Sequence, residues 1–235
     1  MLTLVLTRHG LTDRSTPEQH LGQRIDVSIN DAGRRQAEAL ARRLAPVAFD
    51  RVLTSPLFRA RETAAILAPG ASIEADPRLR EMDYGAWEGR TYDQIAKADG
   101  AFRSEWERAP DVLACPGGES GDDVAERVRG FLGDLLDEHR SWHAKASFRA
   151  ATSGWGSTTP KIERPVLAVG HSSVNRVLIC AALAIEIREF RHRLDQDQAN
   201  LTVLQWDLEA APDEGRMLVM NDTAHLRRAN EVPWA

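Results

Sequence analysis

The sequence of 235 residues predicts an α/β fold, a three-layer αβα sandwich with a mostly parallel central sheet. Short apolar runs rich in Leu, Val and Thr have the length of buried strands. They alternate along the chain with segments whose apolar residues recur every three or four positions, as in amphipathic helices. Strands that alternate with helices typically form a sheet covered by helices on both faces. Ligands of such sheets bind at the carboxyl ends of the strands.

The N-terminal part of the chain begins with one strand and one helix. The apolar run at 2–7 is the first expected strand. Four apolar residues at helical spacing predict a helix over 30–45, which either Asn30 or Asp31 can cap. A second strand is expected at 49–55. This order gives the first strand–helix–strand unit of the sheet.

A second helix is expected directly after the second strand. Ser55 and Pro56 provide an N-cap residue and a proline at the first helical position. The helix LFRARETAAILA follows, and a Pro-Gly pair ends it. The segment 73–82 is expected to be extended and then to turn, and 83–89 reads as a loop punctuated by glycine.

The C-terminal part of the chain continues the same alternation. Short helices are expected over 91–108, and a long amphipathic helix is expected over 122–139. A third buried strand at 165–170 precedes a further helix at 172–184. Two strands that pair at one edge of the sheet follow at 200–207 and 216–222. The segment 143–163 mixes Ser, Thr, Gly and Ala without a clear period. We therefore expect a mobile insertion at 143–163 within a single domain that spans 1–235.

Composition restricts the function classes and the location. A formal net charge of −5 and a pI of about 5.8 argue against nucleic-acid and membrane-surface partners, so a local cluster of cations must attract any anionic substrate. Cys115 and Cys180 share no short spacing and are expected to be free thiols in a reducing compartment. We expect no signal sequence and no membrane-spanning stretch, hence a cytoplasmic protein. Either a monomer or a homodimer is compatible with this composition.

Charged side chains follow three of the expected strands. Arg8 and His9 come directly after the first strand, and Gly10 permits the backbone to turn there. The segment 55–61 follows the second strand, and His171 follows the third. The sheet rule therefore places these residues at one edge. A turn that contains Glu81 can reach the same edge.

The residue types at this edge suit a phosphate dianion. The candidate set consists of Arg8, His9, Glu81, His171 and either Arg59 or Arg61. Arginine supplies planar pairs of donors for phosphate oxygens. A neutral imidazole can attack phosphorus, a second histidine can donate to the phosphoryl oxygens, and a carboxylic acid can protonate the leaving alkoxide and later activate water. Clustered cations favour the neutral, nucleophilic form of His9.

Five ordered motifs carry a family resemblance. They are T-R-H-G at 7–10, S-P-L-F-R-A-R-E-T-A at 55–64, R-E-M-D-Y-G-A-W-E-G at 80–89, P-G-G-E-S at 116–120 and G-H-S at 170–172. With them the chain resembles the histidine phosphatase superfamily, and more narrowly its phosphoglycerate mutase-like branch. The segment N-D-T-A-H-L at 221–226 is similar to the closing segment of many of its phosphatases. The resemblance covers most of the chain and omits chiefly the expected insertion.

The resemblance implies a role for each candidate. His9 would be the nucleophile that forms a phosphohistidine, and Glu81 would be the proton donor. The phosphoryl group would be bound by Arg8, Arg59 and His171, while Arg61 falls outside the motif position. The backbone N–H of Ser172, at a helix N-terminus, could add a contact to the anion. The resemblance implies a small phosphomonoester as the substrate and neither a metal nor a cofactor.

Three positions depart from the family pattern. Leu11 stands where many relatives have Glu or Gln, and Ser15 stands where they usually have an asparagine that contacts the phosphoryl group. Leu21 replaces a glutamine often found before the loop glycine, here Gly22. Ser15 is thus the expected phosphate contact of this loop, and Leu21 and Gly22 are its expected substrate contacts. These departures leave the natural substrate open.

Within the family, a phosphatase is favoured over a mutase. The segment 83–95 is similar to the phosphatase subgroup, and the region lacks the insertion rich in lysine and tyrosine that is typical of mutases. A third possibility is a protein that binds a phosphate-containing ligand without turnover. The presence of both His9 and Glu81 argues against that alternative.

A serine hydrolase is the remaining alternative. The order strand, G-H-S, helix is close to a nucleophile elbow with Ser172 as the nucleophile. The possible partners downstream are Asp195, Asp197, Asp222 and His225. Val174 stands where the tight turn of that elbow requires glycine, and this function would leave the arginines unexplained. The phosphatase therefore remains the favoured prediction.

Overall fold

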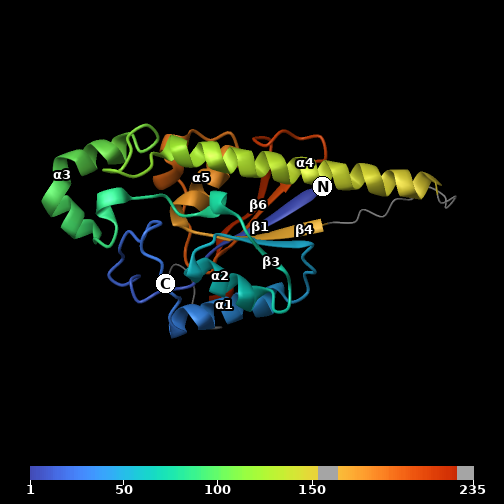
Figure 1. Cartoon of the computed structure of the whole chain (residues 1–235), viewed down its shortest axis with the longest axis horizontal. Helices are drawn as coiled ribbons and strands as arrows, with labels where there is room; N and C mark the ends of the chain where they lie inside the picture. Colours follow the sequence, from blue (N-terminus) through green and yellow to red (C-terminus); the bar gives the residue numbers. More distant parts are fainter. Residues whose placement is uncertain (153–163, 227–235) are drawn as a thin grey trace.

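The computed structural model describes residues 1–152 and 164–226 (Figure 1). The strands are β1 (Leu2–Arg8), β2 (Arg51–Thr54), β3 (Ile73–Ala75), β4 (Arg164–Gly170), β5 (Leu201–Trp206) and β6 (Arg216–Asp222). The α-helices are α1 (Asp31–Leu44), α2 (Phe58–Leu67), α3 (Tyr92–Arg108), α4 (Gly121–Thr152) and α5 (Ser172–Ala182). The 3₁₀-helices are η1 (Pro77–Leu79), η2 (Gly85–Trp87), η3 (Ile187–Arg191) and η4 (Ala224–Leu226).

The strands form one sheet in the order β3-β2-β4-β1-β5-β6. The first four of these are mutually parallel, while β5 runs antiparallel to both of its neighbours, β1 and β6. Arg8 pairs with Gly170 in register, and Thr54 pairs with Val169. The carboxyl ends of β1, β2 and β4 therefore meet at one edge. This arrangement confirms the predicted α/β fold with a mostly parallel sheet and an antiparallel pair at one side.

Helices cover both faces of the sheet. Figure 1 shows α4 and α5 on one side of the strands and α1 and α2 on the other. In β1, Leu4 and Leu6 pack into the core beneath α4 and α5, whereas Val5 packs into the core beneath α1 and α2. All three side chains are buried. A strand that is covered on both faces reads as a continuous apolar run, which is the pattern of 2–7.

The predicted start of the second helix was wrong. Helix α2 begins at Phe58, and its N-cap position is Leu57, not Ser55. The backbone N–H of Phe58 donates to Asp26 Oδ1 at 2.7 Å, so a carboxylate from a distant loop takes the place of a local cap. Ser55 Oγ accepts instead from the N–H of Leu57 at 3.3 Å. The cap of α1 was predicted correctly, because Asn30 Oδ1 accepts from the N–H of Gly33.

Helix α4 is longer than the sequence predicts. It extends to Thr152, so residues 143–152 of the expected insertion belong to a helix, whose end projects past the sheet (Figure 1). The remainder of that insertion, 153–163, lies outside the described residues. Helix α3 contains a kink at Asp99, in agreement with the short helices expected there. No helix in the described part of the chain is both long and apolar enough to span a membrane.

The two cysteines are unpaired and buried. Burial raises the pKa of both thiols to about 12. Cys115 belongs to the loop after α3, and Cys180 lies in α5. Both side chains pack into the core on the α4 and α5 side. They act there as small apolar side chains.

Candidate functional site

His9 lies just beyond the end of β1 and is buried. Its Nδ1 lies 2.7 Å from the carbonyl oxygen of Gly10. Because a carbonyl oxygen can only accept, Nδ1 carries the proton of the neutral ring and Nε2 carries the lone pair. Burial, and then the charges of Arg59 and Arg8, hold the pKa of His9 well below its ordinary value. His9 is therefore a neutral imidazole with Nε2 available as a nucleophile.

Gly10 is required for a different reason from the turn that the sequence suggested. A Cβ at this position would lie 2.5 Å from the carbonyl oxygen of Gly33, in the first turn of α1. That contact is closer than any real Cβ contact, so α1 can pack against the loop only if residue 10 has no side chain. Gly10 thereby fixes the backbone that carries His9.

His171 lies beside His9, with ring centroids 5.1 Å apart in an edge-on arrangement. The Arg59 Nε–H donates to His171 Nδ1 at 3.2 Å, so the proton of neutral His171 is on Nε2. Burial and then the charge of Arg59 hold the pKa of His171 well below its ordinary value. Its Nε2 is buried without a hydrogen-bond partner among the described residues. The ring thus presents an unused N–H donor.

Arg59 is completely buried and acts as the centre of a hydrogen-bond network. Besides the bond to His171, Nη2 donates to the carbonyl oxygen of Gly22 at 2.7 Å and Nη1 donates to that of Ile25 at 3.0 Å. Burial lowers the pKa of the guanidinium to about 10. One side chain therefore orients His171 and ties the loop at 20–29 to the sheet edge.

Gly22 supports this loop and does not line the cavity. Its φ is +56°, and the carboxylate of Glu88 occupies the space that a side chain would need. Glu88 accepts from the backbone N–H groups of Gln23 and Arg24. Gly22 thus positions the loop, and its predicted substrate contact stays a prediction, whereas Leu21 lines the cavity.

Arg8 is held by groups from two separate segments. Nη1 donates to the carbonyl oxygen of Gln196 at 3.0 Å, and Nη2 donates to Glu18 Oε1 at 3.1 Å. Its Nε is buried without a partner among the described residues. Arg8 therefore keeps an unpaired Nε–H while its position is fixed.

Glu81 reaches the N-terminus of α5. Its Oε1 accepts from the backbone N–H groups of Met82, Ser173 and Val174 at 2.9–3.1 Å. Its Oε2 accepts only a longer bond of 3.2 Å, from Ser173. The side chain is buried and lines the cavity. Oε1 is thus saturated, and Oε2 is the atom that can exchange a proton.

The backbone at Glu81 is fixed by a second network. Gln23 Nε2 donates to the carbonyl oxygen of Glu81 at 2.9 Å, and Arg127 Nη2 donates to the same oxygen at 3.2 Å. Glu119 accepts from Gln23, Arg127 and the backbone N–H of Asp83. The P-G-G-E-S motif therefore positions the turn that carries Glu81.

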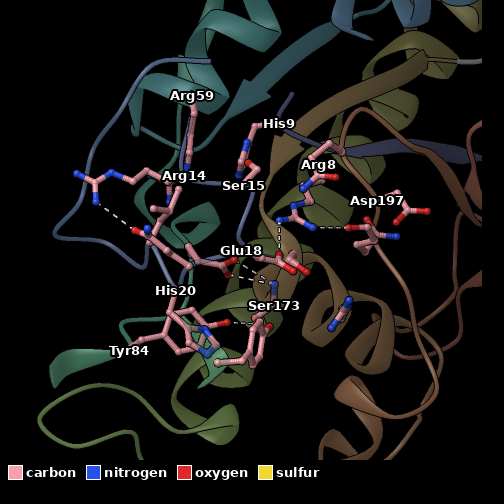
Figure 2. Close-up of a pocket in the computed structure, with 18 residues that line it drawn as sticks. Arg8, His9, Arg14, Ser15, Glu18, His20, Arg59, Tyr84, Ser173 and Asp197 are labelled. Carbon is pink, nitrogen blue, oxygen red and sulfur yellow. Dashed lines mark hydrogen bonds and ion pairs between the residues drawn. The ribbon is translucent and has the colours of Figure 1, made fainter. Parts of the chain in front are cut away.

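These residues enclose one cavity of about 190 Å³. Figure 2 groups His9 with Arg8 and Arg59 at the top of the view, and His20 with Tyr84 and Ser173 at the bottom. The predicted site residues that line the cavity are Arg8, His9, Ser15, Leu21, Arg59, Glu81 and Ser172. His171 contacts His9 and Arg59 but does not line the cavity, and neither do Arg61 and Leu11. The small volume indicates a small ligand.

Ser15 lines the cavity, but its hydroxyl group closes a local turn. Its Oγ accepts from the backbone N–H of Thr12 at 3.0 Å and lies 3.2 Å from the Thr12 hydroxyl oxygen. A serine side chain is also shorter than the asparagine that the family usually has here. Its contribution to phosphate binding remains a prediction.

Sequence reasoning missed more than half of the residues that line the cavity. The missed lining residues are Arg14, Glu18, Gln19, His20, Tyr84, Tyr92, Ser173, Arg176, Gln196 and Gln198. Ser173 and Arg176 could have been found from helical spacing, because Arg176 follows Ser172 by one turn of α5. We call His20, Tyr84, Tyr92, Ser173 and Arg176 the aromatic wall. The ring of His20 packs against Tyr84 and Tyr92 at centroid distances of 4.2 and 4.7 Å.

The structure does not assemble the triad of a serine hydrolase. Ser172 lines the cavity, but His225 does not. His225 Nε2 bonds to the carbonyl oxygen of Ala199 at 2.8 Å, and its Nδ1 faces Arg43. Asp222 is paired with Arg43 as well. The downstream histidine therefore serves the contact between η4 and α1.

No group of three or more His, Cys, Asp or Glu side chains within 1–152 and 164–226 has an arrangement that could hold a metal ion. The charges of Arg59 and Arg8 act on both histidines, and Glu81 acts on Arg59. Arg8 Nη1 donates to the carbonyl oxygen of Gln196 and Arg59 Nε donates to His171, whereas Glu81 accepts from the backbone N–H of Ser173. This edge of the sheet can thus bind an anion, attack it with an imidazole and transfer a proton.

Comparison with known proteins places this geometry in a family. The model of the histidine phosphatase superfamily (branch 1) matches residues 4–147. The chain is 32% identical over 186 residues to glucosyl-3-phosphoglycerate phosphatase of Mycolicibacterium vanbaalenii, which covers 78% of this chain and 75% of that protein. It is 26% identical over 228 residues to phosphoserine phosphatase 1 of Hydrogenobacter thermophilus, with 96% and 95% covered.

Solved structures agree with these sequence matches. The fold is similar to that of YhfR from Bacillus stearothermophilus, with a TM-score of 0.79 and 28% identity over 97% of this chain and 100% of that one. A mycobacterial glucosyl-3-phosphoglycerate phosphatase in complex with VO3 gives a TM-score of 0.75 and 30% identity, with 94% and 98% covered. The family model, the relatives and the fold agree, and the chain therefore belongs to the histidine phosphatase superfamily, branch 1.

Proposed function

We propose that this protein hydrolyses a small phosphomonoester through a phosphohistidine formed on His9. The observation that carries the proposal is the pair of histidine tautomers. Nδ1–H of His9 is bound to Gly10, which leaves the lone pair of Nε2 for phosphorus. Nδ1 of His171 is bound to Arg59, which leaves Nε2–H for a phosphoryl oxygen. The nucleophile and the electrophilic donor are therefore set before the substrate binds.

In the first step, His9 Nε2 forms a bond to phosphorus while the ester P–O bond breaks. The leaving alkoxide takes its proton from Glu81 Oε2, the carboxylate oxygen with the weaker backbone contact. Arg8, Arg59 and His171 surround the phosphoryl oxygens with N–H donors, which stabilises their charge in the transition state. The products of this step are an alcohol and the phosphoenzyme.

In the second step, water replaces the alcohol. Glu81 Oε2 now accepts a proton from the water, whose oxygen attacks phosphorus and breaks the P–N bond to His9. Inorganic phosphate leaves, and His9 and Glu81 return to their starting states. The whole cycle consumes one water and one phosphomonoester. The charge of the phosphoryl group is neutralised by arginine and histidine, so the proposed reaction requires no metal.

The relatives support a phosphatase. The names of the two curated relatives state that they act on glucosyl-3-phosphoglycerate and on phosphoserine. Structures of mycobacterial glucosyl-3-phosphoglycerate phosphatase are known in complex with VO3 and with inorganic phosphate. We extend this chemistry to the present chain because Arg8, His9, Arg59 and Glu81 line one cavity, with His171 in contact with His9 and Arg59. The buried free thiols also support a reducing compartment such as the cytoplasm.

The test is a chemical trap of the phosphoenzyme. Wild-type protein is mixed with ³²P-labelled phosphomonoester and quenched within one turnover, and acid-labile, base-stable label is measured. We expect label on the wild type and none on His9→Ala. The wild type should also hydrolyse p-nitrophenyl phosphate, and vanadate should inhibit that hydrolysis. Equal label on both proteins would refute the role of His9. Exchange of phosphate between the 2- and 3-positions of phosphoglycerate, without release, would instead identify a mutase.

A further inference from the structure

One buried polar side chain of the aromatic wall has no role in the proposed reaction. His20 lies in the loop between β1 and α1, and it lines the cavity. The residue is 4% exposed, and its Nε2 is buried without a hydrogen-bond partner among the described residues. A buried polar group costs free energy unless it forms a hydrogen bond. His20 thus brings to the cavity lining a polar atom that a ligand can satisfy.

The ring of His20 is held in place without the use of this atom. The backbone N–H of His20 donates to the carbonyl oxygen of Arg90 at 3.1 Å. The carbonyl oxygen of His20 accepts from the backbone N–H of Gly89 at 2.7 Å. The rings of Tyr84 and Tyr92 pack against the imidazole. Contacts on the backbone and on the ring therefore fix the imidazole before a ligand binds.

The surroundings of His20 keep its imidazole neutral. Burial, followed by the charges of Arg191 and Arg103, lowers the pKa of His20 to about 3. The guanidinium of Arg103 lies 4.9 Å from the centroid of the Tyr92 ring, against which His20 also packs. A neutral imidazole has one N–H donor and one nitrogen acceptor. His20 can therefore form uncharged hydrogen bonds, and the nearby arginines disfavour a cationic group of the ligand at this place.

A hydroxyl group of the ligand fits this place better than an anionic group. Anionic groups bind more strongly to the guanidinium groups that line the same cavity, which belong to Arg8, Arg14, Arg59 and Arg176. A hydroxyl group can donate as well as accept, so it can bond to Nε2 of His20 in either tautomer of the neutral ring. The tyrosine rings of the aromatic wall add apolar surface for the carbon atoms of an alcohol. Nε2 and these rings together thus match an alcohol.

We infer that His20 determines substrate specificity through a hydrogen bond between its ring and a hydroxyl group on the alcohol part of the substrate. This inference rests on the proposed function, because the phosphoryl group must lie at His9. Figure 2 places His9 at the top of the view and His20 with Tyr84 at the bottom. The alcohol part of the ester extends toward His20 when phosphorus lies beside His9. His20 therefore affects which ester is hydrolysed and takes no part in the bond changes at phosphorus.

The experiment compares phosphomonoesters that differ only in a hydroxyl group. The probes are the n-alkyl phosphates from ethyl to hexyl and the corresponding ω-hydroxyalkyl phosphates, and kcat/KM is measured for each from the release of phosphate. We expect the wild type to prefer the hydroxyalkyl phosphate over its alkyl partner at one chain length. His20→Phe, which keeps an aromatic ring but no nitrogen, should lower that preference roughly 3- to 10-fold, the effect of one uncharged hydrogen bond. His20→Gln should keep part of the preference, because its amide can donate and accept.

The matched control is His192→Phe, the same change at an exposed position outside the cavity, and it should keep the wild-type preference. Circular dichroism and the Tm establish that each variant is folded. If His20→Phe does not fold, ¹⁵N NMR of His9→Ala replaces it, and the hydroxyalkyl phosphate alone should shift the ring nitrogens of His20.

The outcomes separate the inference from the proposed function. The inference is overturned, while the phosphatase function stands, if the wild type shows no preference for the hydroxyl group or if His20→Phe keeps the whole preference. Equal NMR shifts with alkyl and hydroxyalkyl phosphates would overturn it as well. Failure of the wild type to hydrolyse any of these probes or p-nitrophenyl phosphate would instead overturn the proposed function itself.

Discussion

The two sides of the cavity are built differently. On the His9 side, most of the reactive side chains are held through bonds to backbone atoms, such as Gly10 to His9 and Gly22 to Arg59. On the aromatic wall, side chains meet other side chains, as in the 2.6 Å contact between the Tyr84 hydroxyl and Ser173 Oγ. Backbone bonds survive most substitutions, whereas side-chain contacts change with the sequence. We infer that the fold determines the reaction, whereas the side chains of the aromatic wall determine which substrate binds.

Substitution of Glu81 should produce the largest effect that depends on the substrate. In Glu81→Gln the amide oxygen can keep the three bonds to Oε1, but the proton is lost. Hydrolysis of glycerol 3-phosphate, whose alkoxide needs a proton, should fall about 10²- to 10⁴-fold. Hydrolysis of p-nitrophenyl phosphate should fall far less. Steady-state kcat on both substrates measures this, with exposed Glu126→Gln on α4 as the control. An equal loss on both would make Glu81 structural.

Arg59→Lys tests how far the His9 side depends on its fixed geometry. An ammonium group keeps the charge but cannot donate in one plane to His171, Gly22 and Ile25. We expect kcat/KM for p-nitrophenyl phosphate to fall about 10²- to 10³-fold, as for the loss of one oriented donor. Arg61→Lys, two residues later and outside the cavity, should stay within about twofold by the usual tolerance of surface positions. Equal losses of kcat/KM in both variants would show that catalysis does not depend on the planar hydrogen bonds of Arg59.

The sequence predicts the parts of the site that follow local rules. Arg8, His9 and His171 could be placed at one edge because parallel strands end together, and the structure brings them there. Arg176 was within reach of the same reasoning, through helical spacing from Ser172. It was missed because an arginine on a helix usually faces solvent, and no local pattern reveals that this face lines a cavity.

Other features depend on contacts between distant segments. The N-cap of α2 was assigned to Ser55, yet Asp26 binds the first N–H of the helix. Arg8 is held by Gln196, which is 188 positions away along the chain. Such contacts are fixed by the packing of the whole chain and leave no periodic pattern in the sequence. The P-G-G-E-S motif was visible, but its role in holding the Glu81 turn became clear only from the bonds of Glu119.

The aromatic wall should make stability depend on pH. Burial, with Arg191 and Arg103 nearby, lowers the pKa of His20 to about 3, so His20 stays neutral in the folded chain down to that pH. The unfolded chain binds a proton below about pH 6.5, so the free energy of unfolding falls as the pH drops from there toward 3. One such histidine changes the free energy of unfolding by roughly 1.4 kcal/mol per pH unit in this range. We measure the free energy of unfolding in urea between pH 4 and pH 6. His20→Phe should lower its dependence on pH by about this slope. An unchanged slope would show that His20 does not titrate in this way.

Tyr84→Phe should have the smallest effect and would refine the comparison. It removes the hydroxyl group that lies 2.6 Å from Ser173 Oγ but keeps the ring that packs against His20. We expect a loss of about 1 kcal/mol in unfolding free energy, the usual net contribution of one hydrogen bond. Because the Glu81 contacts come from backbone N–H groups of α5, kcat for p-nitrophenyl phosphate should change less than about tenfold by the same energy scale. A larger fall in kcat would mean that the Tyr84–Ser173 contact helps to position Glu81, and the two sides of the cavity would then act as one unit.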